Sequence, residues 1–281
     1  MKLQIRQTGL GKGKNMRYLF IGAHPDDADL LMGGTALKLI RNGHHVKFVS
    51  LCNGNCGHYS MEKSALAERR KKEAERSAAF TGLDAYEVLD NADCELENTL
   101  ENRKEVIRIV REYAPDVVVS HRDCDYHVDH RVTALLVMDS AYILQVPMFC
   151  PEIPIPENTP VYAYAYDRFT KPEPLQPDAV VEIDSVMEEK FQMLNCHDSQ
   201  FYEWLPYNKG LLDFSTEGWS WEQKKEHLDR FWGSRFKDEA VAAKVQLEKR
   251  YGRTVKYAEI FEYSPYGRIV TPEEFQALFP M

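Results

Sequence analysis

Short apolar runs that favour strands alternate with helical patterns along most of this sequence. The runs, in chain order, are MRYLFIGA, VKFVSLC, AYEVLD, DVVVS, VYAYAY and DAVVEID. Helical spacing of apolar residues follows in 30–40, 62–80, 98–113, 132–144 and 184–196. Asp184 is the expected N-cap of the last helix. Strands joined by helices need right-handed crossovers, so we expect an α/β fold with a Rossmann-like, doubly wound, mostly parallel sheet.

The 281 residues suffice for one large domain with an appendage. Five prolines exclude regular structure from 147–160. Farther along the chain, residues 220–250 are expected to form a long helical segment. Beyond residue 200 the sequence is rich in tryptophan and charge. We therefore expect three parts, which are a polar leader at 1–15, an α/β core at 16–200 and a helical C-terminal extension packed on the core at 201–281.

The charge balance narrows the possible partners. A formal charge of −9 argues against a protein that binds nucleic acid through its phosphates. No stretch reaches the roughly 20 apolar residues that a membrane-spanning helix needs, and the N-terminus has no apolar core typical of a signal peptide. We expect a cytoplasmic protein with no membrane span that acts on a small molecule.

Two polar clusters follow predicted strands. His24-Pro25-Asp26-Asp27 comes directly after the first strand, and Asp125-Tyr126-His127-Val128-Asp129-His130 comes shortly after the fourth. In open parallel sheets, ligands bind outside the carboxyl ends of the strands. Imidazole and carboxylate groups suit Zn²⁺, and also Fe²⁺ or Co²⁺. A single cluster of this kind is often only a cap or a packing feature, but the pair at strand ends favours a metal site.

A catalytic zinc ion usually has three protein ligands and one open position for water. A histidine and an aspartate from the first cluster, with a histidine from the second, would supply that set. A remaining carboxylate could accept a proton from the water that the metal activates. Another histidine could stabilise an oxyanion or protonate a leaving group. No Gly-x-Gly-x-x-Gly motif precedes Gly33-Gly34, which argues against a dinucleotide site.

His24-Pro25-Asp26-Asp27 with Gly33-Gly34-Thr35 resembles the signature of the PIG-L/LmbE-like zinc-dependent N-deacetylases, and His127-x-Asp129-His130 resembles that family's second motif. Weaker matches extend the resemblance over most of 17–261. These are Arg70-x-x-Glu73, Pro115-Asp116, Lys190, His197-Asp198-Ser199-Gln200 and Tyr257-Ala258-Glu259-Ile260-Phe261. Ala28-Asp29 departs from the family's commoner glutamate after the aspartate pair.

The resemblance implies an LmbE-like fold and assigns roles by position. The implied zinc ligands are His24, Asp27 and His130. The implied catalytic residues are Asp26 as general base, His127 as the group that polarises the amide carbonyl, and Asp129 as the carboxylate that orients a histidine. The expected substrate-binding residues are Arg70 and His197, of which His197 is expected to line the pocket rather than bind metal.

The expected activity is removal of an N-acetyl group from an N-acetylglucosamine-type amino sugar conjugate. A metal-dependent amidase that acts on a larger sugar-thiol conjugate is one alternative. A carbohydrate-binding protein without activity is another alternative. Such a protein would be expected to lack one or more of the metal ligands, whereas all the expected ligands are present in this sequence. Residues 201–249 match no known motif, so the sequence leaves the aglycone open. It also leaves open whether the protein forms a homo-oligomer.

Overall fold

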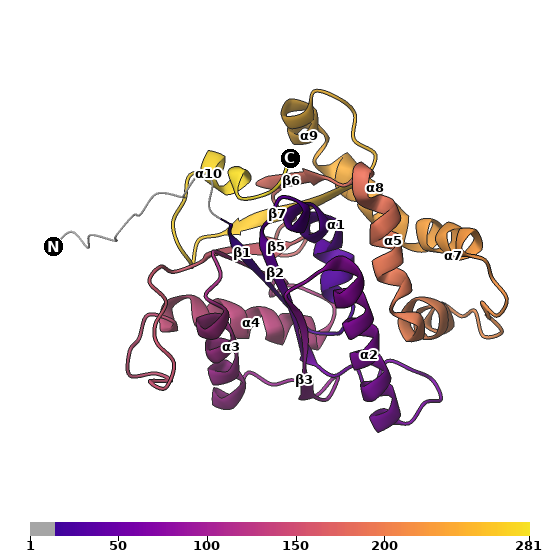
Figure 1. Ribbon diagram of the computed structural model, residues 1–281, viewed down its shortest axis with the longest axis horizontal. Coiled ribbons are helices and arrows are strands. Elements are labelled where there is room, and N and C mark those ends of the chain that lie inside the picture. The colour runs from indigo at the N-terminus through magenta and orange to yellow at the C-terminus, as the bar shows by residue number, and fades with distance from the viewer. Residues whose placement is uncertain (1–14) are drawn as a thin grey trace.

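A computed structural model describes residues 15–281, and its seven strands form one sheet in the order β3-β2-β1-β4-β5-β7-β6 (Figure 1). The strands are β1 (Arg17–Gly22), β2 (His45–Cys52), β3 (Ala85–Asn91), β4 (Val117–Ser120), β5 (Val161–Ala165), β6 (Ala179–Glu182) and β7 (Ala258–Ser264). The predicted leader lies outside the described residues except for Asn15. All six strands that the sequence pattern predicts are present.

The predicted mostly parallel sheet is confirmed. β1 pairs in parallel with β2 on one side and with β4 on the other, and β2–β3 and β4–β5 are parallel too. Only β7 runs against its neighbours β5 and β6. Because β1 lies between β2 and β4, the strand order reverses at β1, and the carboxyl ends of β1 and β4 lie side by side.

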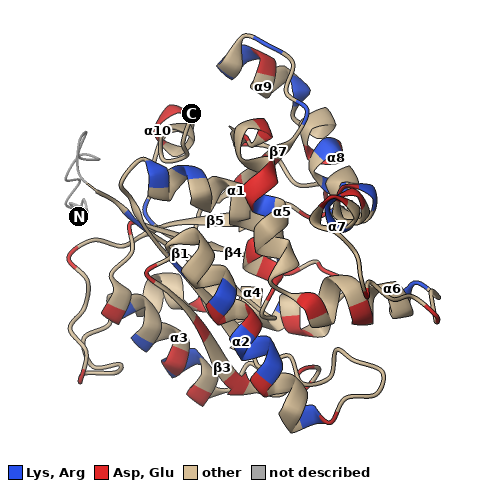
Figure 2. Ribbon diagram, turned by 45° about the vertical axis from the view of Figure 1, so that its right-hand side comes forward, with Lys and Arg blue, Asp and Glu red and all other residues tan. Residues whose placement is uncertain are grey.

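Helices cover both faces of the sheet (Figure 1). The α-helices are α1 (Asp27–Arg41), α2 (Lys63–Thr81), α3 (Leu100–Tyr113), α4 (Val128–Ile143), α5 (Met187–Asn195), α6 (Leu205–Asn208), α7 (Trp221–Leu228), α8 (Ser234–Ala242), α9 (Lys244–Tyr251) and α10 (Pro272–Ala277). One apolar cluster packs α1 and α5 on the sheet, and a second packs α3 and α4 on the opposite face. Charged residues of both signs are concentrated along α2 (Figure 2), and most of them are solvated, but Arg70 and Glu73 are buried.

The structure corrects two expectations about the extension. Residues 201–281 do not only pack on the core, because β7 from this segment lies inside the sheet between β5 and β6. This strand is absent from the predicted set because a charged residue, Glu259, interrupts its apolar run. The expected long helix at 220–250 is divided by a π-helical turn, Asp229–Gly233, and by Ala243, whose φ and ψ of −106° and 20° are not helical.

Three helix starts also differ from expectation. α1 and α4 each begin three or four residues earlier than the apolar spacing predicts, at Asp27 and Val128. Asp184 is not the cap of α5, which begins at Met187. Its carboxylate instead accepts hydrogen bonds from the backbone N–H groups of Lys256 and Tyr257, so it anchors the chain that leads into β7.

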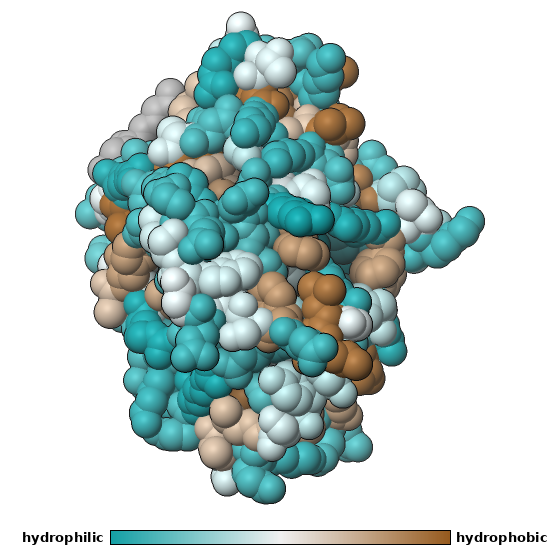
Figure 3. Space-filling view, turned by 90° about the vertical axis from the view of Figure 1, so that its right-hand side faces the viewer, coloured by the Kyte–Doolittle hydropathy of each residue, from teal (hydrophilic) through white to brown (hydrophobic). Residues whose placement is uncertain are grey.

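Within the described part of the chain, no helix has the length and apolarity needed to cross a membrane. The face that carries α5 and α7 is mainly hydrophilic, with its apolar side chains exposed in smaller groups (Figure 3).

A buried ion pair joins α5 to β7, and its carboxylate also holds α1. The Lys190 ammonium and the Glu259 carboxylate contact each other with both side chains fully buried. Glu259 also accepts the backbone N–H groups of Gly34 and Thr35 at 2.8 and 2.7 Å, so it holds the middle of α1. A Cβ at Gly34 would lie 2.7 Å from a methyl group of Ile183, which explains why this position is glycine.

We predict that Lys190→Met lowers the free energy of unfolding by about 3–5 kcal/mol, because it leaves a buried carboxylate without its cation. Urea denaturation measures the change. The control is Lys244→Met, whose ammonium is solvated on α9 and whose loss should cost no more than about 0.5 kcal/mol. Equal unfolding midpoints for the two variants would show that the ion pair of Lys190 with Glu259 does not stabilise the fold.

Candidate functional site

The two polar clusters meet where β1 and β4 end. Ile21 is the register partner of Ser120, so the segments that follow these strands leave the same edge of the sheet. The first cluster leads into the first turn of α1 and the second into the first turn of α4. The sheet thereby brings together two segments that are far apart in the sequence.

Three donor groups face one another at this edge. His24 Nδ1 lies 3.3 Å from His130 Nε2 and 3.6 Å from the Asp27 carboxylate. The other Asp27 oxygen lies 3.5 Å from His130 Nε2. Two imidazole nitrogens and a carboxylate within 3.6 Å of one another form a donor set that zinc, iron and cobalt accept. The residues present therefore fit a divalent metal ion, and they are the three ligands that the family resemblance implies.

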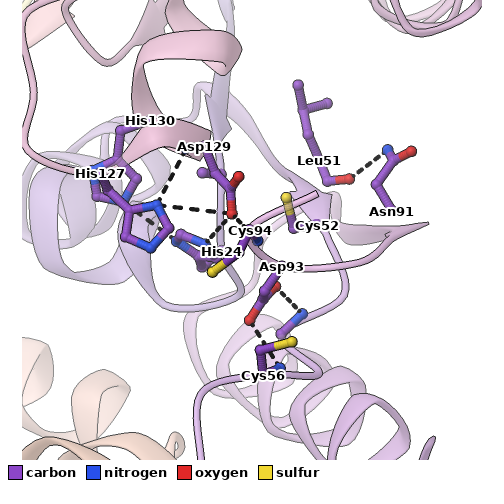
Figure 4. A network of polar contacts seen from close by, with 12 residues as sticks. His24, Leu51, Cys52, Cys56, Asn91, Asp93, Cys94, His127, Asp129 and His130 are labelled. Carbon is purple, nitrogen blue, oxygen red and sulfur yellow. Dashed lines mark hydrogen bonds and ion pairs between the residues drawn. The ribbon is translucent and has the colours of Figure 1, made fainter. Parts of the chain in front are cut away.

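Each of these histidines has a carboxylate on its other ring nitrogen. His24 Nε2 lies 3.1 Å from Asp129, and His130 Nδ1 lies 3.1 Å from Asp125 (Figure 4 shows the His24 contact). Such pairs fix the tautomer and orientation of a ligating imidazole. The geometry agrees with the expectation that Asp129 orients a histidine, and it adds Asp125 in the same role.

The electrostatics of the site favour a cation. Burial lowers the pKa of His24, but the carboxylates of Asp129 and Asp27 outweigh burial and raise that pKa to about 10. Burial also opposes ionisation of Asp27, yet the neighbouring His130 and His121 hold its pKa well below the ordinary value. The same carboxylates that stabilise a positive charge on His24 would stabilise a metal ion beside it.

His121 belongs to this group, although in the sequence it is at least as well explained as an ordinary strand-end histidine. Its ring stacks on that of His130 with centroids 4.2 Å apart, and its Nε2 lies 3.2 Å from Asp27. The signal in the sequence is its place directly after β4. Further donor groups lie close by, namely Cys94 with His127 and Asp129, and Cys52 with His24 and Asp93.

Arg70 holds the expected general base. Its guanidinium donates to Asp26 Oδ1 at 2.7 Å and lies 3.9 Å from Asp93. Burial raises the pKa of Asp26 even though Arg70 opposes the shift. Gly54, at φ +78°, makes room for this arginine, because a Cβ there would lie 2.4 Å from Arg70 Cδ. Arg70 was expected to contact substrate, and it does line the cavity, but its guanidinium is engaged by these two carboxylates.

His127 is held with a defined tautomer at the start of α4. Its Nδ1 accepts the backbone N–H of Asp129 at 3.2 Å, so Nε2 carries the proton of the neutral ring. Burial lowers the pKa of His127, and the adjacent His24 and His130 lower it further. The ring lines the cavity, where its Nε2–H can donate to a substrate oxygen.

His197 does not line the cavity, so the expected substrate contact is not supported for this residue. Its side chain is fully buried, and its Nε2 lies 3.0 Å from Asp29, which is equally buried. Asp29 also accepts a hydrogen bond from Ser77. Asp29, one residue after the position of the family's commoner glutamate, therefore ties the first turn of α1 to α2 and to the segment that follows α5.

The site opens into a cavity of about 520 Å³. Its inner end holds the two polar clusters. Its outer wall comes from 165–169 and from the extension, which contributes aromatic and basic side chains. The outer-wall residues include Tyr166, Arg168, Phe169, Phe201, Trp204, Lys209, Phe231, Trp232 and Arg235. The extension, to which no sequence motif assigns a function, thus lines the cavity.

Known proteins resemble this chain in sequence and structure. A family model described as PIG-L, GlcNAc-PI de-N-acetylase, matches residues 19–141. A diacetylchitobiose deacetylase from Thermococcus kodakarensis is 32% identical over 205 residues, which cover 68% of this chain and 74% of that protein. A 4-oxalmesaconate hydratase from Pseudomonas putida is 25% identical over 201 residues, covering 69% of this chain and 78% of that protein.

Among solved structures, an N,N'-diacetylchitobiose deacetylase from Pyrococcus horikoshii in complex with an inhibitor superimposes with a TM-score of 0.69. It is 26% identical to this chain, and the alignment covers 89% of this chain and 84% of that one. The similarity extends well beyond the segment that the family model matches, so it includes much of the extension.

We predict that Asp129→Asn and Asp125→Asn each weaken zinc binding by about 10–100-fold, because each removes the carboxylate behind a ligating imidazole. Competition with a chromophoric chelator measures the affinity. Asp123→Asn, in the same loop but exposed, is the matched control and should leave the affinity unchanged. Unchanged affinity in all three variants would show that these carboxylates do not support metal ligands.

Proposed function

Because the chain belongs to the PIG-L family of GlcNAc-PI de-N-acetylase-like proteins, we propose that it is a metal-dependent hydrolase that removes the N-acetyl group from an N-acetylglucosamine-type amino sugar conjugate. The observation that carries the proposal is the convergence of His24, Asp27 and His130 beside an independently held carboxylate, Asp26. We propose zinc as the metal, since the donor set is two nitrogens and one carboxylate.

The metal would be held by His24, Asp27 and His130, and when bound it supplies Lewis-acid activation of water and of the amide carbonyl at neutral pH. The proton transfers are then carried out by side chains of the protein. Arg70 occupies one oxygen of Asp26, so the other oxygen is left to accept a proton from the attacking water. The raised pKa of Asp26 suits a base that must later return this proton to the leaving amine.

His127 would stabilise the charge that develops on the amide oxygen. Its neutral ring presents Nε2–H to the cavity, and a fixed donor of this kind stabilises an oxyanion more strongly than it stabilises the ground-state carbonyl. Asp129 contributes indirectly, since its backbone N–H sets the His127 tautomer and its carboxylate orients His24.

One relative of this chain is a 4-oxalmesaconate hydratase, so hydration of a double bond has to be tested beside deacetylation. Both the hydrolysis of an amide and the hydration of a double bond need an activated water molecule. An assay with different substrates therefore has to distinguish the two reactions. Release of acetate from an N-acetylated sugar supports the deacetylase. Loss of ultraviolet absorbance from a conjugated unsaturated diacid, without acetate release from any N-acetyl sugar, would support the hydratase.

We predict that Asp26→Asn lowers kcat for acetate release by about 10²–10⁴-fold while zinc stoichiometry stays unchanged, because an amide cannot accept the proton. Acetate is quantified with an enzyme-coupled assay on N,N'-diacetylchitobiose and on other N-acetylglucosamine conjugates, and metal is measured in the same samples. Asp123→Asn again serves as the control. Wild-type turnover in the Asp26→Asn variant would refute the assignment of the base.

A further inference from the structure

One wall of the cavity comes from a segment without regular structure, 166–173. β5 ends at Ala165 and β6 begins at Ala179, and the chain between them, all of it described, forms neither helix nor strand. Residues 166–169 of this wall segment nevertheless line the cavity. Contacts other than those of the sheet must therefore fix the wall segment relative to the two polar clusters.

The side chain of Arg122 makes such contacts. Its guanidinium donates two hydrogen bonds to the carboxylate of Asp167, from Nε to Oδ2 and from Nη2 to Oδ1, both at 2.6 Å. It also donates to the backbone carbonyl groups of Phe169 and Glu173, at 3.0 Å each. The side chains of Arg122 and Asp167 are only 7% and 10% exposed, so little water competes for these charge-assisted bonds. One buried arginine thus holds the wall segment at three points.

The pair of Arg122 with Asp167 joins the wall segment to the proposed metal centre. Arg122 directly follows His121, whose ring stacks on that of His130. Because Arg122 leaves the sheet at the same edge as the second polar cluster, it sets the position of the wall relative to the metal-binding end of the cavity.

Phe169 carries this positioning into the cavity. Its ring and that of Tyr126 have centroids 6.0 Å apart, and both rings line the cavity. The Tyr126 ring in turn packs edge-on against His127 and His130, with centroids 5.7 Å away in each case. The two aromatic rings therefore stand beside the proposed metal centre. Flat aromatic walls of this kind are typical of sites for small molecules.

Arg122 itself is engaged by the protein rather than free for a substrate. It lines the cavity, but each of its three guanidinium nitrogens donates to a protein acceptor. Nη1 also lies 3.8 Å from the carboxylate of Glu262. An effect of Arg122 on the reaction must therefore pass through the wall segment that it holds.

We propose that Arg122 is a positioning residue that, through Asp167, holds Phe169 against Tyr126, and that these two rings bind the sugar ring of the substrate beside the metal. This inference rests on the proposed function and assigns the subsite for the sugar that carries the acetamide group. Movement of the wall segment weakens binding of that sugar without moving the groups that perform the reaction.

The position of the wall segment is tested without any substrate. The side chain of Arg168 is 52% exposed, so trypsin cuts the bond between Arg168 and Phe169 when the segment leaves its contacts with Arg122. We expect this cleavage to be about tenfold faster in Arg122→Lys than in the wild type, because one ammonium group cannot replace the planar, bidentate guanidinium. Mass spectrometry identifies the bond that is cut. The variant keeps a positive charge beside Asp167, so no buried carboxylate is left unpaired.

The acetate assay on N,N'-diacetylchitobiose tests the subsite. Arg122→Lys should raise KM about tenfold and leave kcat within about threefold of the wild type, because the rings bind the sugar equally in the ground state and the transition state. Phe169→Ala should raise KM by a similar factor. In the Phe169→Ala background, Arg122→Lys should have no further effect on KM, because Arg122 acts through that ring.

Arg111→Lys is the matched control. Arg111 is also a buried arginine that holds an irregular segment, since its guanidinium donates to the backbone carbonyl groups of Leu144, Phe149 and Cys150. It does not line the cavity. This variant should lower the free energy of unfolding but leave KM and the cleavage after Arg168 unchanged.

The outcomes separate the two proposals. Unchanged KM and unchanged cleavage in Arg122→Lys overturn the positioning role. An equal rise in KM from Arg122→Lys with and without the Phe169 ring overturns the route through that ring. If the wild-type protein with zinc bound releases no acetate from N,N'-diacetylchitobiose or other N-acetylglucosamine conjugates, the proposed function fails, and cleavage after Arg168 still decides whether Arg122 holds the wall segment.

Discussion

The parallel pairing of β1 with β4 is the constraint on which the site depends. These strands are distant in sequence, and β1 has its sequential neighbour β2 on the opposite side. Reversal of the strand order at β1 leaves the adjacent ends of β1 and β4 free of a direct connection. Such a switch point is where open α/β sheets bind ligands. Here the chain leaving each strand turns into a helix, and the starts of α1 and α4 bring the donor groups of the proposed metal site together.

Buried ionic contacts hold these helices in place. The contact between Asp29 and His197 holds the first turn of α1. The ion pair of Glu259 with Lys190 lies beside the middle of that helix. Arg70 holds the carboxylate of Asp26. Buried charges contribute little net stability compared with apolar packing, but loss of one partner is costly. The chain therefore uses them to hold α1, which carries Asp27, and the side chain of Asp26 in place beside the cavity. This explains why residues far from one another in sequence, such as Asp29 and His197, accompany the two metal motifs.

The apolar pattern was sufficient to predict six strands and the parallel sheet, because strands buried on both faces leave a continuous apolar signature. α1 and α4 begin earlier than the apolar spacing predicts, for a physical reason. Site residues such as Asp27 and His130 occupy the first turns of α1 and α4, where polar side chains hide the helical spacing. The apolar pattern does not predict β7, because its buried Glu259 resembles a surface residue in sequence. The proposed ligands are recognisable from two motifs, whereas the place of His121, the ion pair of Arg70 and the burial of His197 depend on the three-dimensional packing.

The central claim is that one centre of nitrogen and oxygen donors, His24, Asp27 and His130, binds the metal. Zinc K-edge X-ray absorption on the reconstituted protein tests it most directly, because Zn–N and Zn–O distances of about 2.0–2.2 Å are resolved from Zn–S distances of about 2.3 Å. We predict a first shell of nitrogen and oxygen with the outer-shell scattering of two imidazoles. A sulfur scatterer in the first shell would place the metal at Cys94 or Cys52 and contradict the claim.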